Sequence, residues 1–327
     1  MTALSSALRE VFGERLLLDE PLAPFTTFKL GGPADVFVTA DRPDELQRAI
    51  VLARQASVPV TVIGGGSNLL VADEGIRGVV IRIRGGEVRE VEPGRIRADA
   101  GVTINGLVRW TIAHGLASLE AWAGTPGTVG GAIFGNAHFQ GRNIGDLVDS
   151  VRLLNADGAF ADVPAADMEF AYDHSRLHRT GEIVVSADFR VARGEPEQLR
   201  AVARESLAYR KRTQPLSMPS AGCIFQNPMP GRDTMPEGVP WSAGALVDRA
   251  GLKGAREGQA RVSPTHGNFI VNEGRASAGE VRTLIDRCKR DVYRRFGVRL
   301  REEIVSMGFE PRQTPGPAGT AVSGSES

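Results

Sequence analysis

The chain has few cysteines, no excess of charge of either sign and no long apolar run. Its two cysteines, Cys223 and Cys288, lie far apart, so a disulfide framework is not expected and a reducing compartment is favoured. The 39 Lys and Arg residues balance 39 Asp and Glu residues, which leaves no field to attract nucleic acid or an anionic membrane. No run approaches the roughly 18 apolar residues of a membrane span, and the charged N-terminal stretch is unlike a secretion signal. We therefore expect a cytoplasmic protein without nucleic-acid or membrane partners.

The length and composition allow several domains. The chain has 327 residues, of which 42% are hydrophobic, and a domain typically takes about 100–200 residues. We predict an α+β fold with one lobe over residues 1–85, a second lobe over 86–194 and a C-terminal α+β domain over 195–308. Residues 309–327 offer little to bury, so we expect them to form a disordered tail.

Periodicity predicts the strands of these domains. The run 58–63 is almost wholly apolar, which is typical of a strand covered on both faces. Residues 79–83 alternate between apolar and other residues, which predicts a half-buried strand. Further strands are expected at 34–39 and 182–191, and the turn residues 155–158 predict a hairpin.

Capping and turn residues predict the helices. One begins at Pro43, one extends from Thr103 to Gly115 and one follows Pro196. The last covers about residues 279–297, where apolar residues including Cys288 form one stripe. Cys288 is therefore expected to be structural.

The first glycine-rich segment follows a predicted buried strand. Its residues Gly64-Gly65-Gly66-Ser67-Asn68 allow bare backbone to approach a pyrophosphate. Leu69 stands where the dinucleotide fingerprint has its third glycine, and a strand rather than a helix is expected next, so a Rossmann unit is disfavoured. A plain tight turn is the alternative.

The second glycine-rich segment covers residues 124–132. It lacks the Gly-Lys-Ser/Thr end of a P-loop, and its glycines are too dense for a helix interior. Two such loops would fit together if they closed on opposite ends of one long ligand with a diphosphate in its middle. FAD has that shape, so we expect FAD as the cofactor.

Five segments then point to a family. They are TTFKLGGPAD at 26–35, VIGGGSNLLV at 62–71, GTPGTVGGAIFGNA at 124–137, PSAGCIFQNP at 219–228 and HGNFIVN at 266–272. In order and spacing they resemble the UDP-N-acetylenolpyruvoylglucosamine reductase (MurB) family along nearly the whole chain. The resemblance implies a two-lobed FAD-binding module of the vanillyl-alcohol-oxidase (PCMH) type, followed by a substrate-binding domain.

The resemblance also implies an activity. NADPH would reduce the bound FAD, and hydride would pass to the enolpyruvyl β-carbon of UDP-N-acetylglucosamine enolpyruvate, which gives UDP-N-acetylmuramate for peptidoglycan synthesis. Hydride addition places negative charge on the carboxylate as an enediolate, which needs a donor or a cation, and the α-carbon needs a proton.

Two catalytic positions are implied by the family motifs. Cys223 stands where the family has its proton-donor Ser, and a thiol, with an ordinary pKa of about 8.5, can supply a proton. Glu303 matches the family's C-terminal catalytic Glu. It must be protonated to donate, so we expect a raised pKa. The adjacent Glu302 is the alternative, and neighbours on a strand-like segment point to opposite faces.

The segment around Asp173 departs from the family pattern. Asp173 occupies the position of the family's electrophilic Arg, so another cation must serve. Arg176, His174 and Arg179 are nearest in sequence, and Arg176 is our hypothesis. His174 and His178 are four residues apart, but no third ligand accompanies them, so we expect no metal site.

The remaining site residues are implied by motif position. Those for the cofactor are Gly64, Gly65, Gly66, Ser67, Asn68, Leu69, Gly127, Thr128, Gly130, Gly131, Asn136 and Ile183. Those for the substrate are Tyr172, Ser175, Gln214, Asn227 and Lys253, each of which could equally stabilise a loop. The run NAHFQG at 136–141 departs from the family's small residues, so the contact with the flavin ring is open there.

Two rival functions remain at this stage. One is a flavin oxidase of the vanillyl-alcohol-oxidase type, which the segments around Cys223 and Glu303 disfavour. The other is a flavin-binding or nucleotide-sugar-binding protein without activity, which the Asp173 replacement makes plausible. We expect a monomer.

Overall fold

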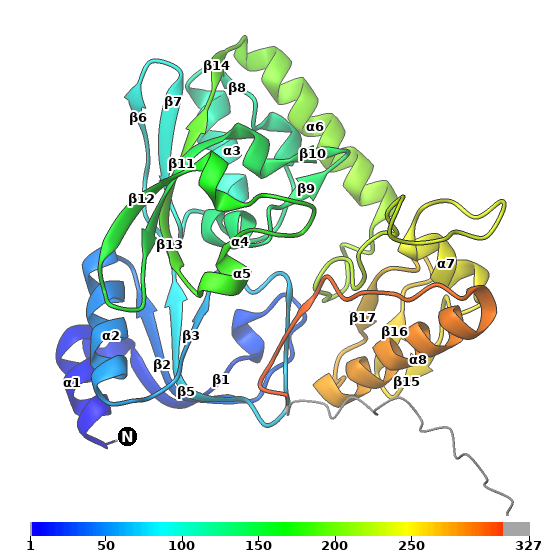
Figure 1. The fold of residues 1–327 in the computed structure, drawn as a ribbon, viewed down its shortest axis with the longest axis horizontal. Coiled ribbons are helices and arrows are strands. Elements are labelled where there is room, and N and C mark those ends of the chain that lie inside the picture. The colour runs from blue at the N-terminus through cyan, green and yellow to red at the C-terminus, as the bar shows by residue number, and fades with distance from the viewer. Residues whose placement is uncertain (1, 310–327) are drawn as a thin grey trace, which may run out of the picture.

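The computed structural model describes residues 2–309, which form two sheet-containing lobes and a smaller third unit (Figure 1). The predicted α+β class is confirmed. The predicted tail lies almost entirely outside the described residues, and the domain boundaries stay predictions. Within residues 2–309 no helix combines the length and the apolar character that crossing a bilayer requires.

The first lobe is built on a four-stranded sheet in the order β1-β2-β5-β3. Strands β2, β5 and β3 run parallel, and β1 is antiparallel to β2. The elements are β1 (Leu16–Pro21), β2 (Pro33–Ala40), β3 (Val60–Ile63), β5 (Ile76–Ile83), α1 (Thr2–Phe12) and α2 (Pro43–Gln55). Both helices bury their apolar stripes against one face of the sheet.

Strands β5 and β3 are buried to the opposite extent from that predicted: β5 is the more buried strand, and β3 is the less buried one. Val79, Val80 and Ile81 of β5 are completely buried, because this strand lies between β2 and β3 and both of its faces are covered. Strand β3 is an edge strand, and Ile63 is its one fully buried residue. Both predictions of face burial are therefore wrong, because the apolar pattern of a short segment does not determine which elements cover the strand.

The second lobe is built on a five-stranded antiparallel sheet in the order β12-β11-β13-β7-β6. Its strands are β6 (Val88–Glu92), β7 (Arg95–Asp99), β11 (Val148–Leu154), β12 (Phe160–Pro164) and β13 (Ile183–Arg190). Its other elements are α3 (Ile104–Ala113), α4 (Val129–Phe134), α5 (Leu177–Thr180), and the short pairs β8 (Leu116–Ala117) with β14 (Ala192–Arg193) and β9 (His138–Phe139) with β10 (Arg142–Asn143).

Local signals in this lobe have the predicted effect in two places. Thr103 caps α3, because its hydroxyl accepts a hydrogen bond from the Gly106 amide. The hairpin of β11 and β12 turns at Gly158, which has a φ of +82°. Gly130 and Gly131, however, lie inside α4, so the expectation that dense glycines prevent a helix is wrong. The helix packs so closely that a Cβ on Gly130 would lie 3.1 Å from that of Ala100.

The long helix α6 (Pro196–Thr213) leads from the second lobe to the third unit (Figure 1). That unit packs a three-stranded sheet against two helices, and its elements are α7 (Ala243–Arg249), β15 (Arg256–Glu257), β16 (Ala260–Val262), β17 (Ile270–Asn272) and α8 (Ala278–Phe296). A reciprocal capping box of Ser277 and Glu280 begins α8. Cys288 is buried in its apolar stripe, as predicted.

The third unit is joined to the first lobe at both ends. Phe28 of the first lobe is completely buried in the core of the third unit, and Asn272 donates to the Phe28 carbonyl at 3.1 Å. After α8 the chain returns to the first lobe (Figure 1), where β18 (Val305–Met307) pairs in parallel with β4 (Leu69–Val71). The segment TTFKLGGPAD therefore includes part of a domain interface.

Candidate active site

The two glycine-rich loops meet each other directly. A Cβ added at Gly65 would lie 2.8 Å from the Gly127 Cα, and one added at Gly127 would lie 2.6 Å from the Ser67 hydroxyl oxygen. The prediction that the loops close on opposite ends of a ligand is therefore wrong. Together they form one surface of bare backbone, which a closely approaching phosphate group requires.

Thr128 gives this surface a polar group that lacks a partner. An added Cβ at Gly64 would lie only 2.3 Å from the Thr128 Oγ1. Thr128 is 5% exposed, and within residues 2–309 its buried hydroxyl has no hydrogen-bond partner. Buried hydroxyls are normally hydrogen-bonded, so the loops fit a bound group that carries oxygen atoms. The diphosphate of FAD meets this requirement.

The first glycine loop is tied to the C-terminal return segment. The Asn68 amide donates to the Glu303 carbonyl at 3.0 Å, and the Asn68 carbonyl accepts from the Val305 amide at 2.9 Å. Leu69 then pairs with Val305 across β4 and β18. Hydrogen bonds thus join the loop predicted to hold the cofactor to the segment that carries the predicted acid.

Cys223 and Glu303 lie on neighbouring backbone segments. The Glu303 amide donates to the carbonyl of Ile224, the residue after Cys223, at 2.9 Å. Burial raises the pKa of the Cys223 thiol well above its ordinary value, and the nearby Glu303 and Asp173 carboxyl groups raise it further. Cys223 therefore stays a protonated thiol at neutral pH, as a proton donor must.

Glu302 and Glu303 are adjacent in sequence, but their surroundings shift their pKa values in opposite directions. Glu302 is paired with Lys289 at 2.8 Å and with Arg282 at 2.7 Å. Burial opposes ionisation of Glu302, but hydrogen bonds from these two cations outweigh it and hold its pKa below the usual value. Glu303 has the opposite balance, because burial and the neighbouring Asp173 raise its pKa well above the usual value. The geometry thus favours Glu303 over Glu302 as the acid.

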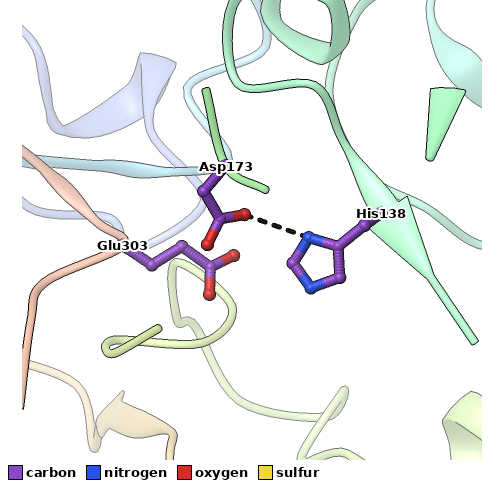
Figure 2. Close-up of side chains that lie close together, drawn as sticks. All are labelled: His138, Asp173 and Glu303. Atoms are coloured by element: carbon purple, nitrogen blue, oxygen red, sulfur yellow. Dashed lines mark ion pairs between the residues drawn. The ribbon is translucent and has the colours of Figure 1, made fainter. Parts of the chain in front are cut away.

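His138, Asp173 and Glu303 converge from three separate segments (Figure 2). One nitrogen or oxygen atom of each lies within 4.8 Å of those of the other two, and the His138 Nδ1 is 3.0 Å from the Asp173 Oδ1. Asp173 has a left-handed φ of +52°. Strained backbone of this kind often marks a functional site, so we regard the group as part of the active site.

Tyr172 connects this group to the third unit. Its hydroxyl accepts a hydrogen bond from the Asn227 amide at 3.2 Å, and its ring lies 4.7 Å from that of His138. Burial raises the pKa of the Tyr172 hydroxyl, and so does the nearby charge of Asp173. Two residues predicted for the substrate, Tyr172 and Asn227, therefore lie together beside the predicted acid.

Arg210 is a buried cation whose guanidinium contacts β9, the strand that carries His138. It is 6% exposed, its guanidinium lies over the Phe139 ring, and it donates to the Thr125 hydroxyl at 2.7 Å. Its positive charge favours the ionised form of Cys223. Burial lowers the pKa of Arg210 to about 10, which still leaves it charged at neutral pH.

Several predicted residues have other contacts. Arg176 forms a two-pronged ion pair with Glu182 at 2.9 and 3.0 Å. Its charge is already matched, so Arg210 replaces it as our candidate cation. Ser175 is completely buried and donates to the Phe134 carbonyl at 2.6 Å, which stabilises the loop. Asn136 is also buried, and its side chain binds two backbone segments. Their contacts with substrate and cofactor stay predictions.

Three other predicted residues have contacts of their own. Gln214 lines a cavity of about 410 Å³ together with Lys211, Arg212 and Arg261. Lys253 is paired with Asp248 at 2.8 Å. Ile183 begins β13 and packs against the core of the first lobe.

Three residues of this site were not predicted from the sequence: His138, Phe139 and Arg210. The departure of NAHFQG from the family's small residues was a signal for the first two. Nothing in the sequence distinguished Arg210 from the other basic residues near the end of α6.

Comparisons with known proteins agree with this architecture. The model of the UDP-N-acetylenolpyruvoylglucosamine reductase C-terminal domain matches residues 214–307, and that of an FAD binding domain matches residues 34–163. The chain is 39% identical to UDP-N-acetylenolpyruvoylglucosamine reductase 1 of a Bacillus cereus strain over 94% of this chain and 100% of that protein. It is 39% identical to the Heliobacterium modesticaldum reductase over 93% of this chain and 95% of that protein.

A solved structure has the same fold. The UDP-N-acetylenolpyruvylglucosamine reductase (MurB) of Thermus caldophilus is similar with a TM-score of 0.73 and 34% identity. The similarity covers 89% of this chain and 98% of that one.

Proposed function

The chain belongs to the UDP-N-acetylenolpyruvoylglucosamine reductase family, and we propose that it reduces UDP-N-acetylglucosamine enolpyruvate to UDP-N-acetylmuramate for peptidoglycan synthesis, with NADPH as reductant and FAD as cofactor. The observation that carries the proposal is the presence of a thiol and a carboxyl group with raised pKa values together with a buried guanidinium. Reduction of an unsaturated carboxylate needs a proton for the α-carbon and a donor or a cation for the developing negative charge. The cytoplasmic location and the monomeric state stay predictions.

The glycine surface is proposed to hold the diphosphate of FAD. Gly64, Gly65 and Gly127 let the two loops pack against each other, and the free hydroxyl of Thr128 can donate to one of the diphosphate oxygens. Bound FAD, reduced by NADPH, supplies the hydride for the enolpyruvyl β-carbon. The remaining steps fall to groups of the chain itself.

Arg210 and Glu303 are proposed to stabilise the charge that hydride addition leaves on the substrate carboxylate. The guanidinium has no carboxylate partner within residues 2–309, so it can attract the substrate carboxylate. Burial and Asp173 raise the pKa of Glu303, and its protonated form can donate to the enediolate oxygen. Fixed donors and charges in a site of low dielectric stabilise such an intermediate strongly.

Cys223 is proposed to deliver the proton to the α-carbon. Its raised pKa keeps the proton on sulfur until the enediolate carbon, a much stronger base, accepts it. The new C–H bond forms as the S–H bond breaks, and the thiolate is then reprotonated from solvent. The charge of Arg210 favours this transient thiolate.

The cavity at Gln214 is proposed to receive the nucleotide part of the substrate. Three basic side chains, Lys211, Arg212 and Arg261, line it together with one acid, Glu273. Glu273 is already engaged by Arg261 at 3.1 Å. The remaining positive charge suits a diphosphate.

The test is a comparison of the Cys223→Ala and Cys223→Ser variants in separate half-reactions. NADPH should reduce the flavin of both variants at the wild-type rate. Reoxidation of the reduced flavin by the substrate should fall at least about a hundredfold in the Ala variant and survive largely in the Ser variant. Equal reoxidation in Ala and wild type would exclude the thiol as donor. A flavin that NADPH leaves oxidised, but that an alcohol reduces, would favour the oxidase.

A further inference from the structure

The β9–β10 hairpin and the segment before α5 are held in register at two points. The Asn136 amide donates to the Ala171 carbonyl at 2.7 Å, and two residues further along each segment the His138 Nδ1 lies 3.0 Å from the Asp173 Oδ1. Asn136 also accepts from the Gly145 amide at 2.9 Å, which anchors it to the lobe behind. The ring of His138 is thereby fixed against Asp173.

Asp173 has one oxygen satisfied and one oxygen without a partner. Its side chain is 10% exposed, and its buried Oδ2 lacks a hydrogen-bond partner within residues 2–309. An unpaired buried carboxylate oxygen is costly. The carboxyl group of Glu303 lies beside it (Figure 2), within the 4.8 Å that groups these three residues. When protonated, that carboxyl group is a donor.

We propose that His138 and Asp173 are positioning residues for Glu303: the His138 ring donates to one oxygen of Asp173, and the other oxygen of Asp173 holds the proton-bearing carboxyl group of Glu303 until the substrate carboxylate takes its place. The inference rests on the proposed function, because it explains how Glu303 arrives with a proton to donate. It also explains an acid at 173. A negative charge there opposes the enediolate directly, but it keeps the proton on its neighbour.

The two positioning residues act on Glu303 in opposite directions. The charge of Asp173 disfavours a second carboxylate beside it and therefore raises the pKa of Glu303. Donation from His138 stabilises the Asp173 carboxylate, so the pair of acids releases its proton more readily when His138 is present. None of the variants below substitutes the other titratable groups of this site, which are Tyr172, Cys223 and Arg210.

The experiment measures flavin reoxidation by the substrate in the pre-reduced holoenzyme as a function of pH. The rate should fall as pH rises through the pKa of Glu303, because the acid is then lost. In Asp173→Asn this fall should move to lower pH by about one unit or more. His138→Phe keeps an aromatic ring on Tyr172 but cannot donate to Asp173, so the pH at which the reoxidation rate falls should increase. His138→Gln, whose amide can donate, should move it back towards wild type.

The matched control is His114→Phe on the exposed surface of the second lobe, which should leave the pH profile unchanged. Shifts of the same sign in Asp173→Asn and His138→Phe, or no shift in either, would overturn the proposal. Activity that a chelator abolishes and a divalent cation restores would also overturn it, because the three side chains would then hold a cation instead of a proton.

A second measurement does not depend on turnover. Infrared difference spectra of the oxidised holoenzyme, wild type minus Glu303→Gln, should contain the carbonyl band of a protonated carboxyl group at neutral pH. The spectrum of Asp173→Asn minus that of the double variant with Glu303→Gln should contain the same band. As pH rises, the band should disappear at a lower pH than it does in the wild-type difference spectrum. If the substrate does not reoxidise the flavin but these bands behave as stated, the proposed function fails and the positioning inference stands. An ionised Glu303 at neutral pH in the wild type would overturn the inference itself.

Discussion

The guanidinium carbon of Arg210 lies 3.7 Å from the centroid of the Phe139 ring. The ring covers one side of a charge that no carboxylate of residues 2–309 neutralises, while the Thr125 hydroxyl holds one of its nitrogens. Phe139 follows His138 on β9, so adjacent residues of one short strand support the two charged parts of the site. The buried cation and the acid pair are therefore organised by the same hairpin.

Replacing Arg210 with Met should abolish most of the substrate half-reaction. The methionine keeps apolar contact with Phe139 but removes the charge that stabilises the enediolate, so we expect reoxidation by the substrate to slow by about a hundredfold or more. Rapid mixing of pre-reduced enzyme with the substrate measures this rate. Arg204→Met, which removes an exposed arginine of the same helix, should leave it unchanged. If both variants reoxidise at the wild-type rate, Arg210 is not the electrophilic cation.

Replacing Gly65 with Ala should weaken flavin binding. The added Cβ would lie 2.8 Å from the Gly127 Cα, so the two loops must move apart and lose their common surface. We expect FAD affinity to fall at least about tenfold, equivalent to about 1.4 kcal/mol, as measured by titrating FAD into the apoprotein.

The control for Gly65 is Gly279→Ala, where the nearest contact of an added Cβ is 3.6 Å and the position opens a helix. Its flavin affinity should match wild type. Thermal melting of both apoproteins separates loss of the cofactor from loss of the fold. A Gly65→Ala protein that melts normally and binds FAD at wild-type strength would contradict the proposed cradle.

Replacing Glu302 with Gln should destabilise the fold without altering the chemistry. Glu302 is paired with Arg282 and Lys289, so we expect a loss of about 1–3 kcal/mol in the free energy of unfolding at pH 7, measured by urea denaturation. Because its folded-state pKa is depressed, its contribution is present above the unfolded value of about 4.3. The contribution should disappear as pH falls through the lower, folded-state value.

Glu257→Gln is the matched control for Glu302, because Glu257 is exposed on a short strand of the same unit. It should change stability by less than about 0.5 kcal/mol. The assignment of this ion pair would be contradicted if Glu302→Gln were as stable as wild type at pH 7. It would also be contradicted if the loss in the free energy of unfolding persisted below the folded-state pKa of Glu302.

Local signals predicted those parts of the fold that short stretches determine. The cap at Thr103, the turn at Gly158 and the stripe around Cys288 depend on nearby residues only. Edge and central strands could not be distinguished, because the burial of Val80 depends on which strands pair on either side of β5. Likewise, close packing against Ala100 allows Gly130 inside a helix, and the sequence contains no sign of that contact.

The site was predicted in its separate pieces but not in its connections. The departure at His138 and the conflict at Asp173 were each visible in the sequence, but only the fold places one against the other. Arg210 lies among other basic residues at the end of α6, and burial alone distinguishes it. Motif position identified Ser175, and nearness in sequence to Asp173 suggested Arg176. Their partners, the Phe134 carbonyl and the Glu182 carboxylate, come from packing.

The pairing of β18 with β4 joins the last described strand of the chain to a loop near its beginning. During synthesis, residues 64–69 leave the ribosome long before Glu303 and Val305 exist to bind Asn68. The cofactor loop of the first lobe therefore lacks these hydrogen bonds until residues 303–307 have been made. A chain that stops before residue 303 would lack both the acid and this support of the loop, so we expect reduction of the substrate to require synthesis past that point.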